Sequence, residues 1–219
     1  MAEIVKSNIV VVAENLNPSI FREMWLVKEG VFAENEIKSG SLYSSVSVNV
    51  QTPDSDLLII PERLQLTLKT DERQDEVIKK VLVTVVEALP HTPYKAIGFN
   101  FHWVLETSGQ REISEVTQDM FLSEKNPLRN IFAADDVRVG VYLSKDELGM
   151  RLKLEVRPVK GVVENAGKEA LRLNFNFDKL INNQENATEI VLETIDKWLA
   201  AKAISENIVK EVSENAAFI

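Results

Sequence analysis

Two stretches decide the fold: RLQLTL at residues 63–68 and RLNFNF at residues 172–177. Each alternates polar and apolar side chains, which is the pattern of a β-strand with one buried face. Each runs into a segment with an apolar stripe at helical spacing, ending near Leu89 in the first case and near Leu199 in the second. The two strands begin 109 residues apart in a chain of 219. Because this offset is half the length, we predict an internal duplication.

The same order of elements is expected in both halves of the chain, residues 1–93 and residues 94–219. Each half reads as a strand, a helix, three or four antiparallel strands and a final helix. The expected strands are residues 4–14, 25–33, 42–51, 57–60 and 64–68, then residues 94–106, 137–144, 150–159 and 171–177. Since hairpin connections dominate, we predict an α+β fold of two βαβββα-type halves, with amphipathic helices packed on one face of a largely antiparallel sheet. The halves should form one compact unit with a shared core.

The composition is that of a folded globular protein, with 45% hydrophobic and 27% charged residues. No apolar run approaches the roughly 18–20 residues that cross a bilayer, so no membrane partner is expected. The first six residues lack the basic and apolar regions of a secretion signal, and the chain has no cysteine, so a cytoplasmic location is expected. The net charge of −9 marks an acidic protein and argues against general polyanion binding, which makes nucleic acid an unlikely partner.

The order of elements is similar to that of two known folds. It resembles the TATA-binding-protein fold, in which two such halves form one curved sheet. It also looks like the helix-grip fold of the plant pollen-allergen type, in which a long C-terminal helix lies in the grip of a sheet. Both resemblances concern the order of elements and imply a fold only.

A further resemblance lies in the sequence. LLIIPERL at residues 57–64, IGFN at residues 97–100, a strand at residues 171–177 and a helix at residues 190–218 resemble the landmarks of a sporadically distributed, functionally uncharacterised prokaryotic family. They cover about half of the chain. The polar pattern usual after the glycine in that family is replaced here by Phe99, Asn100 and Phe101. Since the family has no established activity, this resemblance implies a fold and no chemistry.

Residues of the catalytic types are present without the spacing that chemistry requires. The two histidines, His91 and His102, belong to no metal-binding motif. The adjacent acids lie at turns or helix starts, where carboxylates complement the helix dipole. The chain has no GxSxG or GxGxxG motif. We therefore expect no catalytic residue, no metal and no cofactor, and an enzyme is the less favoured interpretation.

One distributed feature suggests a binding surface. The residues opposite the apolar stripe of the expected strands contain seven bases and one acid, although the chain as a whole is acidic. The wider set includes Ser45, Ser47, Arg138 and Glu155. The predicted binding residues are Arg63, Gln65, Lys69, Asn100, His102, Arg151, Lys153, Arg157, Arg172 and Asn174. The simpler alternative is a solvated sheet face, because long basic side chains commonly cover such surfaces.

These observations favour a non-catalytic binding or interaction protein that uses a polar, locally basic sheet face to engage an anionic or polar partner. A protein partner or a homo-oligomer is the first expectation, and a small anionic ligand is the second. The alternative is a small-molecule carrier, or an enzyme, with a cavity beneath the C-terminal helix. Ile195, Trp198 and Leu199 would be core residues in the first interpretation and would line the cavity in the second. Ser205 is expected to break or kink that helix.

Overall fold

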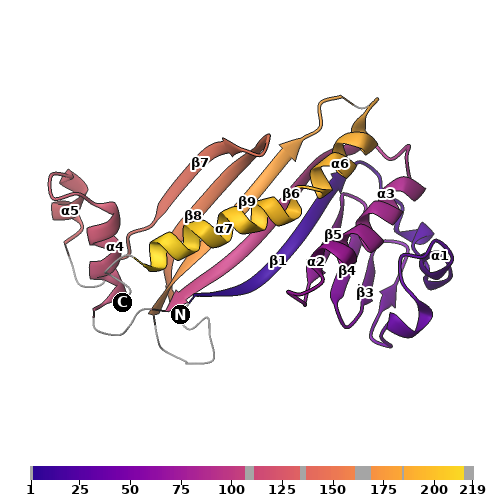
Figure 1. The fold of residues 1–219 in the computed structure, drawn as a ribbon, viewed down its shortest axis with the longest axis horizontal. Coiled ribbons are helices and arrows are strands. Elements are labelled where there is room, and N and C mark those ends of the chain that lie inside the picture. The colour runs from indigo at the N-terminus through magenta and orange to yellow at the C-terminus, as the bar shows by residue number, and fades with distance from the viewer. Residues whose placement is uncertain (1, 107–110, 134–136, 161–168, 184, 215–219) are drawn as a thin grey trace.

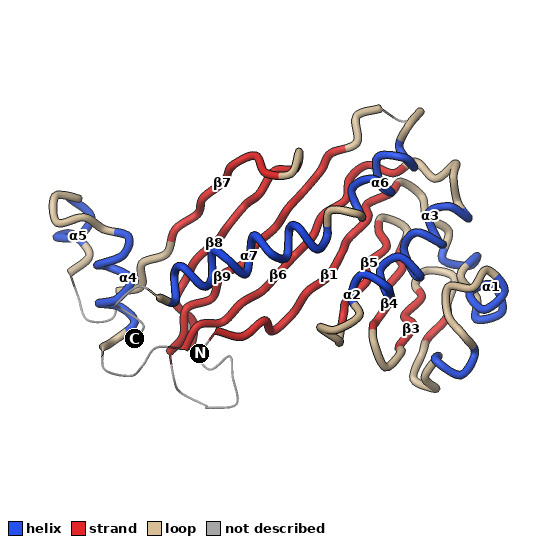
Figure 2. The backbone as a smooth tube through the Cα atoms, in the orientation of Figure 1, coloured by secondary structure: helices blue, strands red, loops and turns tan. Residues whose placement is uncertain are grey.

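The described residues form one antiparallel sheet, with α7 (Trp198–Ser213) and α6 (Ala187–Ile195) lying over one face and α4 (Ile113–Phe121) and α5 (Pro127–Ile131) beyond one end (Figures 1 and 2). The computed structural model describes residues 2–106, 111–133, 137–160, 169–183 and 185–214. The predicted α+β fold, with a largely antiparallel sheet, is confirmed. No helix within the described residues is both long and apolar enough to cross a membrane.

Within the described residues the sheet has nine strands, in the order β2-β3-β4-β5-β1-β6-β9-β8-β7. The strands are β1 (Ala2–Ala13), β2 (Leu42–Tyr43), β3 (Val48–Gln51), β4 (Ser55–Ile60), β5 (Arg63–Leu68), β6 (Tyr94–Glu106), β7 (Val141–Glu147), β8 (Met150–Lys160) and β9 (Glu169–Leu180). Every neighbouring pair is antiparallel.

Helices occur between and after the strands in both halves of the chain. They are α1 (Glu23–Lys28), α2 (Gln74–Ile78), α3 (Thr84–Ala88), α4 (Ile113–Phe121), α5 (Pro127–Ile131), α6 (Ala187–Ile195) and α7 (Trp198–Ser213), with the short helices η1 (Pro18–Ile20), η2 (Glu34–Glu36) and η3 (Lys79–Val83). η3 is a π-helical turn that joins α2 to α3 without a break. These three elements form the predicted helix that ends near Leu89.

The strand order is symmetric about the central pair, β1 and β6. Beside β1 lie β5, β4 and β3, and beside β6 lie β9, β8 and β7, so the corresponding strands of each half take the same places. α1 follows β1 in the first half, and α4 follows β6 in the second half. This arrangement is the one expected of two βαβββα-type halves, while the duplication itself stays a prediction.

The core lies between the sheet and the helices. Ile9 of β1 pairs with Phe99 of β6, which pairs with Phe177 of β9, and all three side chains are fully buried. Apolar residues alternate in these strands, so one whole face becomes hydrophobic and must be covered. α7 lies over the central strands and covers that face (Figure 1).

Trp198, the first residue of α7, occupies the centre of this core with no exposed surface. Its ring makes an edge-to-face contact with Phe99 at 5.4 Å and lies 4.6 Å from the ring of Phe101. Its indole Nε1 donates a hydrogen bond of 3.1 Å to Oε1 of Gln74 in α2. A buried indole N–H needs such a partner, and here the partner comes from the other half of the chain. Ile195 is also core, but Leu199 is 53% exposed, so its prediction as a core residue was wrong.

The strand predicted at residues 25–33 is wrong, because α1 lies there. Val31 and Phe32 are adjacent and both buried, which a strand with one buried face does not allow. Gly30 follows the helix with a φ of +76°, and its N–H bonds to the carbonyl of Val27. Glycine adopts this left-handed conformation without strain, so it ends the helix. The apolar residues of the segment had suggested a strand instead.

Two further strand boundaries differ from the prediction. The strand expected at residues 42–51 is divided into β2 and β3 by a turn that Ser44 stabilises by accepting a hydrogen bond from the Ser47 N–H at 2.9 Å. Ser45 and Ser47 therefore lie in the turn, and Val46 between them is exposed. Arg138 lies ahead of β7 rather than within it.

The C-terminal helix is interrupted at residues 196–197, between α6 and α7, and not at Ser205. The Ser205 side chain is buried inside α7. Its hydroxyl donates to the carbonyl of Lys202 at 2.7 Å and accepts from Nε1 of Trp103 at 3.3 Å. Serine is tolerated here because its hydroxyl bonds within the helix and completes a polar contact with the sheet.

Replacing Trp198 by alanine should lower the free energy of unfolding by about 3–5 kcal/mol, because it removes the largest fully buried side chain and takes away the indole donor to Oε1 of Gln74. Urea denaturation followed by circular dichroism measures this change. The matched control is Leu199→Ala on the same turn of α7, which should change the free energy of unfolding by no more than about 0.5 kcal/mol. Equal effects of the two substitutions would contradict the central role of Trp198.

Candidate functional site

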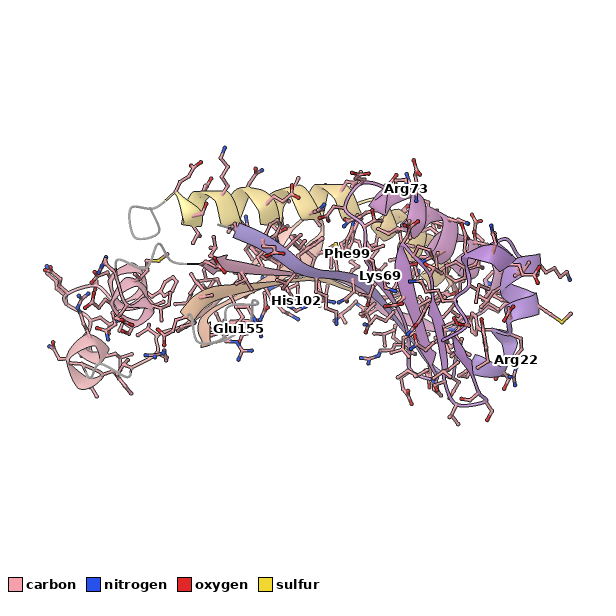
Figure 3. The ribbon with its side chains drawn as sticks, turned by 90° about the horizontal axis from the view of Figure 1, so that it is seen from below. Arg22, Lys69, Arg73, Phe99, His102 and Glu155 are labelled. Carbon is pink, nitrogen blue, oxygen red and sulfur yellow. The ribbon has the colours of Figure 1, made fainter. Side chains whose placement is uncertain are left out.

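The face of the sheet opposite α7 is polar. The sheet bends between β1 and the strands β3 to β5, so this helix-free face is concave, with His102 and Glu155 on it (Figure 3). We call it the concave face. It carries all ten sequence-predicted binding residues: Arg63, Gln65, Lys69, Asn100, His102, Arg151, Lys153, Arg157, Arg172 and Asn174. The strand register places them on one face, since residues directly opposite one another share a face. It does not bring all of them together: Arg63 lies in the row of Ala96 on β6, whereas Arg172 lies in the row of Val104.

Three asparagines form a hydrogen-bonded row across the centre of the concave face. Asn8 of β1 pairs with Asn100 of β6, which pairs with Asn176 of β9. The Asn100 amide donates to Oδ1 of Asn8 at 2.9 Å, and the Asn176 amide donates to Oδ1 of Asn100 at 2.8 Å. Asn8 is only 5% exposed, so its carbonyl depends on this bond. The row fixes the alignment of the three central strands.

A second polar row runs beside the first. Asn174 donates from its amide to Oε2 of Glu155 at 2.9 Å, and its Oδ1 lies 2.8 Å from Nδ1 of His102. Because a carboxylate only accepts, the Asn174 amide must face Glu155, which leaves its oxygen to accept from His102. Nδ1 of His102 therefore carries a proton and donates a hydrogen bond to Asn174.

Much of the basic charge of the concave face is neutralised. Lys69 lies 2.5 Å from Asp56, Arg151 lies 3.1 Å from Asp146, and Lys153 lies 2.6 Å from Asp178. The sequence-based count of seven bases against one acid on this face was therefore wrong, because it left out these three aspartates. All three aspartates lie in strands whose ends the sequence pattern had missed: β4, β7 and β9.

One part of the concave face keeps an excess of positive charge. Arg157 of β8 and Arg172 of β9 are directly opposite one another in the strand register. We call these two residues the arginine pair. Like charges in directly opposite positions destabilise a sheet. The Arg157 guanidinium lies 3.9 Å from Glu155, and Arg172 makes no ion pair within the described part of the chain. Lys6, opposite His102 on β1, is exposed and also makes none there.

Besides Lys6 and the three aspartates, sequence reasoning missed two residues of this face. Asn8 interrupts the apolar run of β1, and that interruption was the signal for the asparagine row. Tyr142 of β7 lies opposite Glu155 at the outer edge of the face and is 63% exposed. It is an exposed aromatic side chain beside the bases, which the sequence analysis had not placed there.

The side chains of the concave face are amides, an imidazole, lysines, carboxylates and guanidinium groups. Of these, a guanidinium group without an acid partner can bind carboxylate or phosphate oxygens. Within the described residues no cluster of three or more histidine, aspartate or glutamate side chains is arranged to hold a metal ion.

No protein-family model matches this chain, and no sequence among the curated proteins matches it significantly. The resemblance to a prokaryotic family and to the two folds therefore stays a prediction.

Replacing Asn100 by alanine should lower the free energy of unfolding by about 1–3 kcal/mol, because it removes the donor to the buried carbonyl of Asn8 and the acceptor of Asn176. Guanidinium denaturation measures the change. Asn207→Ala on the exposed side of α7 is the control and should stay within about 0.5 kcal/mol of the parent protein. A neutral Asn100→Ala would show that the asparagine row adds nothing to stability.

Proposed function

We propose that this protein is a non-catalytic interaction protein that binds an acidic segment of another protein on its concave face, centred on the arginine pair. The observation that carries the proposal is the opposition of Arg157 and Arg172 on adjacent strands. A single acid, Glu155, stands within ion-pair distance of one of them within the described residues.

An anionic partner would convert this unfavourable arrangement into a favourable one. Two carboxylate oxygens placed between the guanidinium groups would offset the repulsion between Arg157 and Arg172 and accept bidentate hydrogen bonds. Lys6, opposite His102 on β1, offers a further exposed cation.

An acidic protein segment suits the surface better than nucleic acid does. The chain carries a net charge of −9, which repels an extended polyanion outside the local basic region. Proteins that bind single-stranded nucleic acid commonly stack successive bases on several aromatic side chains, whereas Tyr142 lies at the outer edge of this face.

A cytoplasmic location belongs to the same proposal and rests on the absence of cysteine.

The alternative of a carrier or an enzyme with a cavity beneath the C-terminal helix has less support. The space between α7 and β6 around Trp198 is filled by the rings of Phe99 and Phe101. A ligand there would have to displace fully buried aromatic side chains.

Replacing both Arg157 and Arg172 by serine should weaken binding of a fluorescein-labelled oligoglutamate peptide at least about tenfold, because charge-assisted hydrogen bonds are worth roughly 1.5–3 kcal/mol each. Fluorescence anisotropy at low ionic strength measures the affinity, and added salt should weaken binding to the parent protein.

The matched control replaces Arg151 and Lys153 by serine. This variant has the same net charge as the first, but the bases that it removes are already paired with Asp146 and Asp178. It should bind the peptide within about twofold of the parent protein, since the arginine pair is intact. Equal losses in the two variants would show that net charge alone governs binding and would refute the proposed site.

A further inference from the structure

The outer edge of β7 is an unpaired edge of the sheet. β7 pairs with β8 along its whole length on one side, and the strand order ends with it. Within the described residues no strand or backbone hydrogen bond covers its other side. The strand presents two large exposed side chains, Tyr142 at 63% and Leu143 at 56%. A long unpaired edge with exposed apolar residues is a template for pairing with another chain.

At the opposite end of the sheet, the outer edge of the strand that corresponds to β7 is covered by the chain itself. β3 corresponds to β7 in the strand order, and its outer edge is occupied by β2. Beyond β2, the Lys38 N–H donates to the carbonyl of Gln51 at 2.8 Å, and the Gln51 N–H donates to the Ser41 hydroxyl at 3.0 Å. The first half thus caps its outer strand with its own chain. Within the described residues, the second half supplies no such cap for β7.

We propose that β7 of one copy pairs antiparallel with β7 of a second copy, about a two-fold axis that passes beside Leu143. In this register Leu143 faces Leu143 of the second copy, and Tyr142 faces Ser144. Val141 lies opposite Lys145, whose aliphatic stem can pack on it. The interface lies at the sheet edge, one strand outside Arg157, and goes beyond the proposed function.

The sequence of β7 favours a second copy as the occupant because it is complementary to itself in this register. No pair of like charges is directly opposed when the axis lies at Leu143. An axis at Lys145 or at Asp146 would oppose that residue to its own copy and would be repulsive. An axis at Ser144 would place Leu143 against Lys145 and Tyr142 against Asp146, which leaves each apolar side chain beside a charge.

The pairing would also preserve the two faces of the sheet. Residues directly opposite one another in an antiparallel pair share a face, so the helix-covered faces of the two copies become continuous. The two concave faces likewise become continuous. Both copies would then present their arginine pairs on the same side of one extended sheet.

Sedimentation velocity over a wide range of concentrations tests the association. The parent protein should show a concentration-dependent monomer–dimer equilibrium. Leu143→Lys should be monomeric over the same range, because it places like charges on the axis. Val46→Lys is the matched control, since it introduces the same charge at an exposed valine at the other end of the sheet, and it should dimerise like the parent protein. A parent protein that stays monomeric throughout would overturn the proposal, as would equal disruption by both substitutions.

A cysteine substitution tests the register directly, because the chain has no cysteine of its own. Directly opposite Cα atoms in antiparallel strands lie about 4.5–5.5 Å apart, within the range of a disulfide. Leu143→Cys should therefore form a covalent dimer under mild oxidation, seen on non-reducing gels, whereas Ser144→Cys should not. Cross-linking through Ser144→Cys instead, or through neither position, would overturn the pairing about Leu143. Retention of oligoglutamate binding by the Leu143→Lys monomer would separate this interface from the proposed acidic-segment site.

Discussion

The antiparallel pairing of β1 with β6 is the constraint on which the rest of the structure depends. The two strands pair from Ala2 with Leu105 to Ala13 with Tyr94. Within the described residues they are the only strand pair that joins the two half-sheets. This pairing brings Phe99 and Phe101 beneath α7, where Trp198 covers them. It also sets Asn8 beside Asn100, so the asparagine row exists only while the strands are in this register. One ladder thus determines both the core on one face and the polar surface on the other.

The sequence was sufficient to predict the fold class because strands with one buried face carry a simple alternation. Residues 63–68 and residues 172–177 both show it, and both are strands in the structure. Strand ends were less predictable. Asp56 and Asp178 extend the polar side of β4 and β9, but charged residues at the end of an apolar run also mark turns. α1 was missed because it buries only Leu26 and therefore shows no apolar stripe of helical period.

The sequence was enough to predict which face of the sheet carries the candidate site. It was not enough to predict the contacts between the residues on that face. Alternation alone places Arg157 and Arg172 on the polar side of their strands. Whether they stand opposite an acid or opposite each other depends on the register of β8 against β9, which alternation alone does not specify. The same register pairs Lys153 with Asp178 and removes that lysine from the available charge. Sequence reasoning therefore overestimated the basic surface and could not locate the place where positive charge stays unbalanced.

The position of β1 in the sheet has a consequence for the order of events on the ribosome. Synthesis delivers β1 first, then β5, and β6 only after the whole first half has emerged. During that interval β1 is paired with β5 on one side only. The other edge, along which Ile9 and Val11 later pair with β6, stays open. A nascent chain in this state exposes a strand edge that is prone to wrong pairing. The speed at which residues 94–106 follow the first half out of the exit tunnel therefore sets how long the chain is vulnerable to aggregation.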